Sequence, residues 1–582
     1  MPSTVDSKKP SSRAVWLGAS GAVAALTLTL MLATEPFLPI VWDEGFTLLR
    51  LARVRAWLAA VRDPEPFAAR WNPRAIGVAL DDVVDPPSAS EINTRSKLFS
   101  ARVIAWFWPF ARAEPHGHPP FYALLALIGD GLTPGRDELS RARLGAMLLF
   151  AATNGALFAS LLTRRGFWSG VLGAGAFALS PQLFAMGHYA HYDAPLTCLW
   201  LGSILAFSEA TTTVPAGKLA NGRSPRWGWV VVFGVLVGAG AGTKLTGWLL
   251  PLPFLIWTLL YRERKGALTL ALGALVAAAT VYAVTPPWWF APWSGLSQFF
   301  RSNLTRGEST PIPVQFLGTV YVSPNESLPW YNTLIWTVAA SPVCFLAWAL
   351  AGSVRAVRER GDRLASLAML CWAFPLVLRA LPHTPAHDGV RQILPAFGIL
   401  ALVAGLGVSA RPSLRSRCLV MAAVLEGAVS IAVMMPIPLS YFSPVVGGLP
   451  GAAAIGFEPT YYWDTLTPDV LGWVNEHTDP GRSIAFMGTP TSYYYLKQSG
   501  RLRPPAIPFD RGLPLQWYLV QNRPGVMDAM DRALIDRFGR RRRLLSKLGV
   551  PLVWAFERSE MEAISPENGS ISSKRARAGP AR

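Results

Sequence analysis

Residues 142–165, ARLGAMLLFAATNGALFASLLTRR, form a long apolar run that ends in two arginines. A second apolar run begins after Gly166 and continues to about Ala185. Runs of about 17–25 apolar residues are long enough to cross the hydrocarbon core of a membrane as a helix. Because short basic loops between such helices favour the cytoplasmic side, we expect the first run to descend to Arg164 and Arg165 and the second to return outward.

Short basic clusters recur along the first 440 residues, each where one apolar run gives way to the next. They lie at residues 8–13, 164–165, 218–226, 262–265, 355–363 and 411–417. About eleven transmembrane helices place all of these clusters on one side, which predicts a polytopic α-helical membrane protein with a cytoplasmic N-terminus. The first three predicted spans are 14–39, 142–162 and 168–185, and the fourth lies between Asp193 and the 218–226 cluster. The fifth and sixth are 227–241 and 245–261, and the last five end near Pro286, Arg355, Pro382, Arg411 and Pro436.

The composition agrees with a membrane protein. Hydrophobic residues make up 51% of the chain, charged residues only 15%, and the mean hydropathy is +0.30. The 23 Trp and 28 Phe fit aromatic belts at the two membrane surfaces. A net charge of +18 would indicate a nucleic-acid partner in a soluble protein. Here much of the excess lies in the short loops, so we expect no nucleic-acid partner. The four cysteines lie in or beside apolar runs, which argues against a disulfide framework.

The chain divides into four parts by this pattern. Residues 1–13 form a cytoplasmic tail, 14–437 a transmembrane domain with a first outer loop at 42–140, 438–564 a small soluble α/β unit on the outer side, and 565–582 a disordered tail. Residues 46–61 and 98–110 have the apolar spacing of helices that lie in the membrane interface. In the outer unit we predict helices at 468–476 and 527–548 and strands at 483–487 and 550–556.

The predicted topology brings most of the chemically reactive residues to the outer face. They are Asp43, Glu44, His116, His118, Arg143, His191, Asp193, Lys244, His387, Asp388 and Arg391. A group of polar and charged side chains at the outer ends of apolar helices is typical of a binding or catalytic site at a membrane surface.

Each of these residues also has a structural interpretation. Asp43 and Glu44 could stabilise a helix N-terminus, where negative charge is favourable, or supply a general base or a cation ligand. Asp193 could cap the fourth span. Lys244 could extend to the interface or contact a phosphate. Arg141 and Arg143 both lie near the outer start of the second span.

His116 and His118 flank a glycine and precede Pro119 and Pro120, which suit the first turn of an apolar helix. The pair could form an interfacial turn or part of a binding site. Two histidines without a third ligand nearby in the sequence are a weak indication of zinc.

Several of these motifs resemble the GT-C membrane glycosyltransferases, above all glycosyltransferase family 39 with its protein O-mannosyltransferases and lipid A aminoarabinose transferases. The motifs are Trp42-Asp43-Glu44, His118-Pro119-Pro120, Asp193-Ala194-Pro195-Leu196, Gly242-Thr243-Lys244, the segment 387–395 that begins His387-Asp388-Gly389, and Tyr441-Phe442-Ser443 with Gly447-Gly448. The resemblance covers about residues 14–460 and implies a GT-C architecture. His387 stands where the family pattern has an aromatic residue, and Phe442-Ser443 replaces Tyr-Asn, so the acceptor and the need for a cation are open.

The resemblance implies transfer of a sugar from a polyprenyl-phosphate donor to an acceptor on the outer side, with inversion at the anomeric carbon. Asp43 would be the base for the acceptor hydroxyl, Glu44 would orient the acceptor or nearby backbone, and Asp193 would complete the acidic site. A divalent cation between Asp43 and Asp193 is one option. His118 would shape the cleft, and Lys244 with Arg143 would hold the lipid phosphate. His116, His191, His387, Asp388 and Arg391 are further candidates for substrate binding.

A polyprenyl-lipid transporter or flippase is the main alternative, because it would need the same charges in the membrane. Compared with eukaryotic mannosyltransferases the sequence shows no large sugar-binding domain, so a lipid or a glycan is a better candidate acceptor than a protein. The abundance of Arg, Ala, Gly and Pro suggests a GC-rich bacterial source. We therefore expect the bacterial inner (cytoplasmic) membrane, with a periplasmic C-terminus and membrane lipids as neighbours.

Overall fold

The structure is a computed structural model that describes residues 12–76, 84–112, 117–212, 225–305, 312–322, 326–359, 361–386, 388–507 and 512–564. Two predicted site residues, His116 and His387, lie outside the described residues. The predicted tail at 565–582 and all but the last two residues of the predicted tail at 1–13 lie outside them as well.

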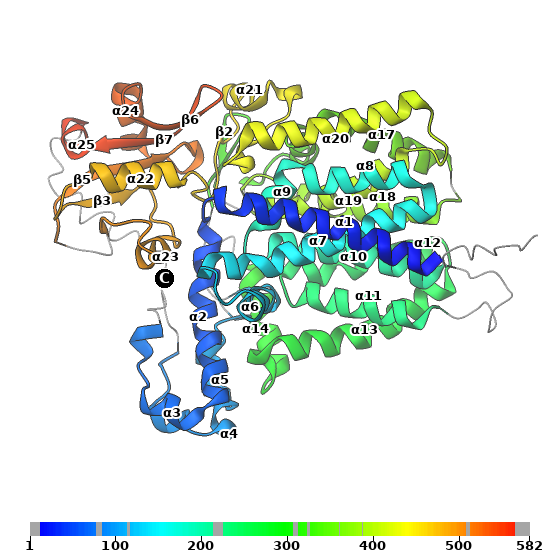
Figure 1. Cartoon of the computed structure of the whole chain (residues 1–582), viewed down its shortest axis with the longest axis horizontal. Helices are drawn as coiled ribbons and strands as arrows, with labels where there is room; N and C mark the ends of the chain where they lie inside the picture. The colour runs from blue at the N-terminus through cyan, green and yellow to red at the C-terminus, as the bar shows by residue number, and fades with distance from the viewer. Residues whose placement is uncertain are drawn as a thin grey trace, which may run out of the picture.

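Long apolar helices form the body of the molecule, and Figure 1 shows most of them running roughly along its long axis. They are α1 (Ser12–Thr34), α7 (Glu138–Arg165), α8 (Phe167–Leu179), α9 (Pro181–His188), α10 (Asp193–Thr211), α11 (Trp227–Ala241), α12 (Pro251–Leu260), α13 (Arg264–Val284), α16 (Asn332–Ala339), α17 (Val343–Arg358), α18 (Arg363–Ala380), α19 (Leu394–Gly407) and α20 (Leu414–Met434). A helix or a broken pair of helices therefore lies at each segment predicted to span.

Five helices of the described residues are long and apolar enough to cross a membrane, namely α1, α7, α13, α18 and α20. The bent pair α8–α9 would make six, and four shorter apolar helices accompany them. Proline breaks some predicted spans, since it lacks the N–H that continues a helix. Pro181 begins α9 after a bend of 63° between the two helices, and Pro251 begins α12 after a 3-10 turn at Leu245–Leu249. The number of eleven spans stays a prediction.

Burial differs strongly between the apolar helices. Of the most apolar window of α7, 78% is buried inside the protein, whereas only 11% of that of α1 and 17% of that of α13 is buried. The exposed side chains of the outer helices include Leu26, Leu275 and Leu425. Apolar helix surface left open in this way is suited to contact with lipid chains.

The first outer loop crosses one end of the helix bundle. Its helices are α2 (Trp42–Arg62), α3 (Pro64–Ala69), α4 (Arg95–Leu98), α5 (Ala101–Phe107) and α6 (Phe121–Leu132), and Figure 1 shows α2 nearly at right angles to the bundle. We expected the apolar face of α2 to lie in the membrane interface. Leu51 and Val54 are instead fully buried, and Trp57 packs edge-to-face against Trp108 at 5.5 Å. The rest of the loop thus covers this face.

Residues after α20 contain a five-stranded sheet in the order β4-β3-β5-β7-β6. The strands are β3 (Ser483–Phe486), β4 (Ala506–Ile507), β5 (Leu515–Gln521), β6 (Arg543–Lys547) and β7 (Val550–Glu557), and the helices are α21 (Gly448–Ala454), α22 (Pro468–His477), α23 (Tyr493–Gln498), α24 (Ala529–Phe538) and α25 (Arg558–Ile564). Strand β3 runs parallel to β4 and β5, whereas β7 is antiparallel to β5 and β6. Two smaller outer elements are α14 (Pro292–Leu304) and the hairpin of β1 (Val314–Phe316) and β2 (Thr319–Tyr321).

The helix predicted at 527–548 is wrong in its second half, where residues 543–547 form β6. Lys547 pairs with Val550 across a two-residue turn, and both turn residues, Leu548 and Gly549, have positive φ. Such a turn matches the twist of antiparallel strands and closes a hairpin. The arginines of this segment therefore belong to a helix, a turn and a strand rather than to one helix.

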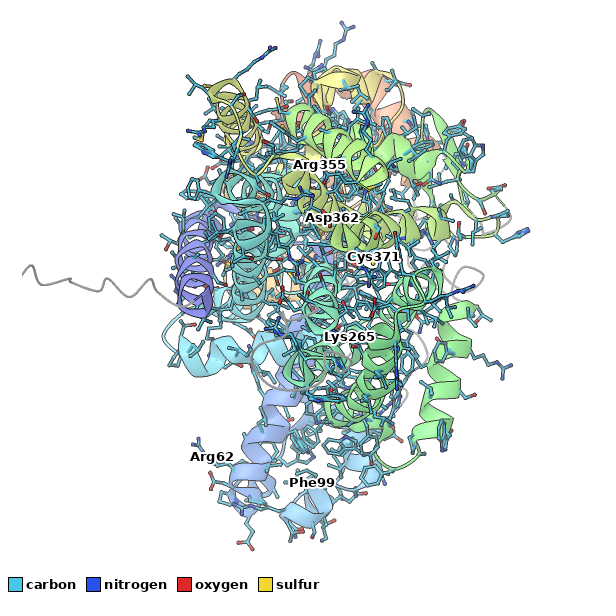
Figure 2. All side chains as sticks on the ribbon, turned by 90° about the vertical axis from the view of Figure 1, so that its right-hand side faces the viewer. Arg62, Phe99, Lys265, Arg355, Asp362 and Cys371 are labelled. Atoms are coloured by element: carbon cyan, nitrogen blue, oxygen red, sulfur yellow. The ribbon has the colours of Figure 1, made fainter. Side chains whose placement is uncertain are left out.

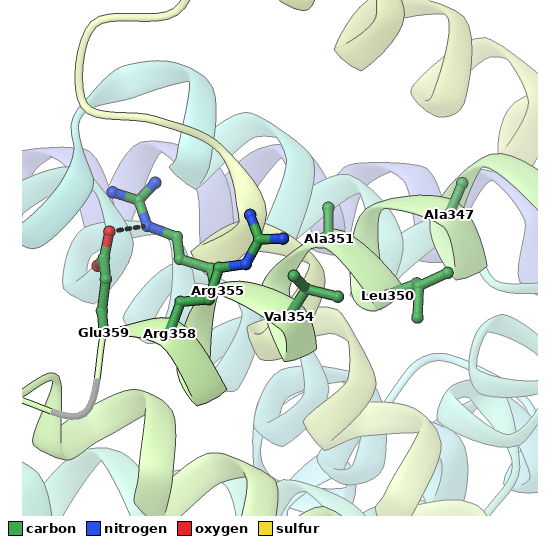
Figure 3. A pocket seen from close by; sticks show the side chains of 7 residues that line it. All are labelled: Ala347, Leu350, Ala351, Val354, Arg355, Arg358 and Glu359. Carbon is green, nitrogen blue, oxygen red and sulfur yellow. Dashed lines mark hydrogen bonds and ion pairs between the residues drawn. The ribbon is translucent and has the colours of Figure 1, made fainter.

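The opposite end of the bundle gathers several of the predicted inner basic clusters. Arg164 lies 2.7 Å from Glu209, and Arg165 lies 2.5 Å from Asp362. Figure 2, viewed from the right-hand side of Figure 1, labels Lys265, Arg355 and Asp362 on the helices and loops of this end. A groove of about 540 Å³ follows α17 from apolar side chains to Arg355, Arg358 and Glu359, as Figure 3 shows. Loops far apart in the sequence thus meet at one charged end, as the topology requires.

Candidate functional site

Asp43 and Glu44 are neighbours in the first turn of α2, but their carboxylates lie in different surroundings. Successive residues of an α-helix point about 100° apart. The Glu44 side chain is completely buried, whereas 15% of the Asp43 side chain is exposed. The two acids therefore belong to two separate clusters of charges.

Glu44 lies in the first cluster, which is centred on Arg143 of α7. Arg143 donates to both Glu44 carboxylate oxygens, at 2.8 and 2.7 Å, and to Glu35 at 3.2 Å. Its guanidinium also donates to the backbone oxygens of Glu35, Leu38 and Pro39. Glu44 in turn accepts from the backbone N–H groups of Val41 and Ala190. All five N–H donors of Arg143 are therefore used within the chain.

This arrangement bears on the roles expected for two residues. Arg143 is fully buried and faces Glu35 and Glu44, not the second cluster, where we expected it to hold a phosphate. Glu44 accepts the N–H of Val41, the N-cap of α2, so it has the capping role considered for the Asp-Glu pair. We refer to Glu35, Glu44 and Arg143 as the closed cluster.

Asp43 lies in the second cluster, which joins four charged residues from distant parts of the sequence. Arg391 forms ion pairs with Asp43 and with Asp193, the latter at 2.6 Å. Lys244 donates to the other oxygen of Asp193 at 2.7 Å. We refer to Asp43, Asp193, Lys244 and Arg391 as the open cluster, because Asp43 keeps part of its surface exposed.

Breaks between helices place these four side chains. Asp193 begins α10, Lys244 follows α11 in the turn before the 3-10 segment, and Arg391 begins a 3-10 turn that leads into α19. No side chain caps α10, so Asp193 does not have the capping role considered for it. Lys244 is only 6% exposed and does not extend to a surface. Side chains from distant segments of the sequence therefore form ion pairs inside the protein.

Tyr192 lies at the centre of the open cluster. Its hydroxyl contacts Arg391 and lies 3.4 Å from Asp43. Its ring lies 5.0 Å from the Lys244 ammonium and 4.0 Å from the His118 ring. The backbone after His118 is held as well, since Phe121 N–H donates to the Gly242 oxygen at 2.9 Å. The His-Pro-Pro and Gly-Thr-Lys motifs therefore meet beside Tyr192.

His191 supports the turn before α10. Its Nδ1 accepts the backbone N–H of Asp193 at 3.0 Å, which requires that nitrogen to be unprotonated. Burial lowers the pKa of His191 and so favours the neutral ring. This histidine orients the backbone of Asp193.

Asp388, the remaining predicted residue that is described, pairs with a residue that the motifs did not indicate. Arg523, in the loop after β5, forms an ion pair with Asp388 and lies 3.7 Å from Glu458. The backbone N–H of Arg391 donates to the backbone oxygen of Asp388 at 3.3 Å. Arg523 thus connects the sheet to the loop that carries Arg391. Its Asn-Arg-Pro-Gly context is typical of an ordinary turn and indicates no function for Arg523.

A second contact joins the outer unit to the start of α2. Thr491 donates through its hydroxyl to the backbone oxygen of Trp42, and the N–H of Trp42 donates to the Tyr462 oxygen at 2.8 Å. A side chain at Gly45 would collide with the backbone of Thr491 and Ser492. The glycine allows this close approach. Trp42, the residue before Asp43, is therefore held at both its N–H and its oxygen by residues that follow the last apolar helix.

An apolar cavity of about 380 Å³ lies between α11, the 3-10 turn, α13 and α14, and its walls include Ala241, Gly247, Trp248, Val281 and Trp288. Lys244 does not line it, but the 3-10 turn that follows Lys244 supplies Gly247 and Trp248 to its wall.

The residues of the open cluster do not fit a divalent cation well. Lys244 and Arg391 occupy both oxygens of Asp193, and Arg391 also holds Asp43. A cation there would have to displace or approach two positive side chains. The described residues contain no group of three or more His, Cys, Asp or Glu that could hold a metal ion.

Comparisons with known proteins found similarity over part of the chain. No curated protein matches the chain significantly. Among solved structures, the chain is similar to ArnT from Cupriavidus metallidurans bound to undecaprenyl phosphate, with 15% identity, a TM-score of 0.48, and coverage of 93% of this chain and 98% of that chain. It is also similar to the oligosaccharyltransferase AglB from Archaeoglobus fulgidus in complex with an inhibitory peptide and a dolichol-phosphate, with 13% identity, a TM-score of 0.44, and coverage of 88% and 70%. Residues 117–290, which include His118, Asp193 and Lys244, match the family model of the dolichyl-phosphate-mannose-protein mannosyltransferases, and this match confirms the predicted resemblance for that part of the chain.

Proposed function

We propose that this chain is an integral membrane glycosyltransferase that moves a sugar from a polyprenyl-phosphate donor to an acceptor at the outer face of the membrane. The observation that carries the proposal is the open cluster itself. It combines a partly exposed carboxylate, Asp43, with two buried cations, Lys244 and Arg391, at the end of a bundle of apolar helices. The family match over residues 117–290 supports the same reaction class.

Asp43 is the proposed general base. Its carboxylate takes the proton of the acceptor hydroxyl as that oxygen attacks the anomeric carbon of the sugar. The bond between this carbon and the phosphate oxygen breaks, and the electron pair leaves with the lipid phosphate. Attack from the face opposite the leaving phosphate inverts the anomeric centre. Arg391 and Tyr192 hold Asp43 in place before the reaction.

Lys244 and Arg391 are the proposed contacts for the departing phosphate. Fixed cations in a site without bulk water stabilise the negative charge that develops on phosphate oxygens. Asp193 keeps both cations in position through its two oxygens. The polyprenyl chain is proposed to lie in the apolar cavity beside the 3-10 turn that follows Lys244, because its walls suit isoprenoid units.

The closed cluster has a proposed structural role. Arg143 fixes the start of α2 through Glu44 and the 35–39 segment through backbone oxygens. We therefore propose that Glu44 and Arg143 stabilise the folded connection between α1 and α2 and do not contact the substrates.

The proposed location is a bacterial inner membrane, with the open cluster on the periplasmic side. The basic clusters at the opposite end of the bundle support this orientation.

A transfer assay tests the proposed function. Purified protein in lipid is given radiolabelled polyprenyl-phosphate sugars one at a time, with water or a simple alcohol as surrogate acceptor. We expect transfer from at least one donor, and loss of that transfer in Asp43→Asn. Binding of the lipid phosphates without turnover of any sugar would contradict the proposal and favour a lipid transporter.

A further inference from the structure

Residues 458–465, with the sequence EPTYYWDT, link the helix bundle to the sheet and lie beside the open cluster. The backbone oxygen of Tyr462 accepts the N–H of Trp42, one residue before Asp43. The Tyr462 ring lies 5.1 Å from the guanidinium of Arg391. The segment therefore forms a wall of the same site, although the family match ends well before it.

The backbone of this wall is strained at its centre. Tyr462 and Trp463 both have positive φ, at 58° and 57°. Bulky residues seldom adopt this conformation, which is unfavourable and persists where the surroundings enforce it. Strain of this kind concentrates at binding and catalytic sites. Here it fixes the directions of Tyr462 and Trp463.

The side chains of the wall are buried, and several of their polar atoms have no partner among the described residues. These atoms are the hydroxyls of Tyr461, Tyr462 and Thr465 and one carboxylate oxygen of Asp464. Exposure is 5% for Tyr461, 8% for Tyr462 and zero for the other two. An unsatisfied buried polar group destabilises the folded state, so four within five residues indicate a missing hydrogen-bonding partner.

Some buried tyrosines elsewhere have partners. Tyr122 accepts from Arg50 at 2.7 Å, and Tyr518 donates to Asp531 at 2.7 Å, whereas the hydroxyls of Tyr189 and Tyr441 have none among the described residues. In the wall, Tyr461 lies against the Arg391 loop, since a side chain at Gly389 would come within 3.4 Å of its hydroxyl. What distinguishes the wall is that four such atoms occur within five residues next to the open cluster.

The chemistry of these atoms suits hydroxyl groups rather than phosphate. Phenols and a threonine hydroxyl both donate and accept, and the carboxyl group accepts, which matches the alternating donors and acceptors of a sugar. Residues 458–465 themselves contain no Lys or Arg that could pair with a phosphate. Tyrosine rings also offer flat apolar faces with a polar edge.

We propose that residues 458–465 bind the sugar of the donor through its hydroxyl groups, with Tyr462 nearest the open cluster and Tyr461 and Asp464 beside it. This proposal rests on the proposed function, because it takes the phosphate of the same donor to lie at Lys244 and Arg391. It assigns the two ends of one substrate to two surfaces. The cations hold the lipid phosphate, and the wall recognises the sugar.

Binding measurements with and without the sugar test this division. Affinities are measured in lipid nanodiscs, in the Asp43→Asn background to prevent turnover. The ligands are undecaprenyl phosphate and undecaprenyl phosphate carrying mannose, glucose or 4-amino-arabinose. We expect at least one glycosylated lipid to bind more tightly than the bare phosphate. Tyr462→Phe, Tyr461→Phe and Asp464→Asn should each weaken that lipid about threefold to tenfold, the effect of one lost hydrogen bond, and change undecaprenyl phosphate less than twofold.

Tyr518→Phe is the matched control, because it removes a paired tyrosine hydroxyl inside the sheet. It should leave both affinities unchanged. Equal weakening of the bare and the glycosylated lipid in the wall variants would overturn the proposal, and so would unchanged affinity for both. A wild-type wall that does not favour any glycosylated lipid would also overturn it. Failure of the proposed function would differ, since no lipid phosphate would then bind or no sugar would be transferred by the wild type.

Discussion

Asp43 and Glu44 are adjacent in α2 but lie in different clusters. The clusters differ in how many hydrogen-bond and ion-pair donors the chain supplies to each carboxylate. Both Glu44 oxygens receive an Arg143 donor and a backbone N–H, and its side chain has no exposed surface. Asp43 receives Arg391 and a long contact from Tyr192, and 15% of its side chain is exposed. A saturated buried ion network holds the fold together. A carboxylate with remaining surface can still meet a substrate.

The comparison also shows why the two arginines are not equivalent. Arg143 directs all its donors to oxygens of residues 35–44, which lie within a short stretch of chain. Arg391 joins Asp43 to Asp193, two residues 150 positions apart in the sequence. The closed cluster therefore stabilises a local connection between α1 and α2. The open cluster unites three distant motifs, as a site assembled for chemistry would.

Asp43→Asn should give the largest effect. The amide keeps the shape of the side chain but cannot take a proton, so we expect transfer to fall about 10²–10⁴-fold, the usual contribution of a general base. The melting temperature should stay close to that of the wild type, because Asp43 is partly exposed. Transfer rates with a saturating donor check this, and retention of more than a tenth of the wild-type rate would remove Asp43 from the mechanism.

Arg143→Met should reveal the structural role of the closed cluster. Removal of one member leaves Glu35 and Glu44 buried without a counter-charge, which costs about 3–5 kcal/mol. We expect a low yield of folded protein and a lower melting temperature in detergent. Arg141→Met, two residues away and partly exposed, is the control and should fold normally. Normal stability of Arg143→Met with loss of lipid binding would reverse the roles of the two clusters.

Lys244→Gln should weaken the binding of undecaprenyl phosphate about tenfold to a hundredfold. A hydrogen bond to a charged group contributes about 1.5–3 kcal/mol, which corresponds to this range. Equilibrium binding in nanodiscs measures the change, and Lys497→Gln on the outer unit serves as control. If the affinity does not change, Lys244 only neutralises Asp193 and the open cluster loses its phosphate contact.

Arg523→Gln tests whether the ion pair between Arg523 and Asp388 affects the open cluster through the loop that carries Arg391. Loss of the ion pair with Asp388 should loosen the Arg391 loop and lower kcat/KM about threefold to tenfold, the effect of about 1 kcal/mol. Asp388→Asn should have a similar effect, and the double variant should be no worse than the poorer single variant. Arg558→Gln, which breaks an exposed pair, is the control. Fully additive losses would show that Arg523 and Asp388 act separately.

Stability should change modestly with pH through Glu458 and Asp464. Burial raises the pKa of Glu458 to about 7, with Asp388 acting in the same direction and Arg523 in the opposite one. Burial also raises the pKa of Asp464, which lies near Gln521, to about 8. Acids in an unfolded chain titrate near 4. Their protonated forms therefore favour the folded state below pH 4, and this contribution is lost as the pH rises to 7–8.

Melting temperatures between pH 5 and 9 measure this loss. We expect the melting temperature to decrease gradually toward pH 9. The matching loss in free energy of unfolding is about 1 kcal/mol or more, and it should be smaller in Asp464→Asn. A melting temperature that rises with pH, or an equal slope in the variant, would contradict the assignment of these protonated acids.

The sequence predicted the helices and the open cluster better than the closed cluster. Apolar runs and basic loops gave the helix positions, because both follow from the cost of placing polar groups in lipid. Asp43, Asp193, Lys244, Asp388 and Arg391 were singled out by their place at helix ends. Hydropathy alone does not locate breaks such as that at Pro181, because the run is apolar on both sides of the proline.

Tertiary pairing could not be predicted in the same way. Nothing in the sequence indicates whether Arg143 turns toward Glu44 or toward the site, since both lie at the outer ends of helices. Arg523 and Tyr462 were missed because they follow the recognisable motifs and act through contacts across the fold. The two-residue turn at Leu548 and Gly549 was overlooked because arginines continued the helical pattern up to it.

The most direct test of the account measures transfer and thermal stability together for Asp43→Asn and Glu44→Gln. Folded protein is quantified in each sample, so that the rate refers to folded molecules. The account predicts opposite outcomes for these two neighbouring positions. Asp43→Asn should melt like the wild type and lose transfer, whereas Glu44→Gln should melt at a lower temperature and keep most transfer per folded molecule. A stable Glu44→Gln without activity, or an active Asp43→Asn, would contradict the separation of a structural from a catalytic cluster.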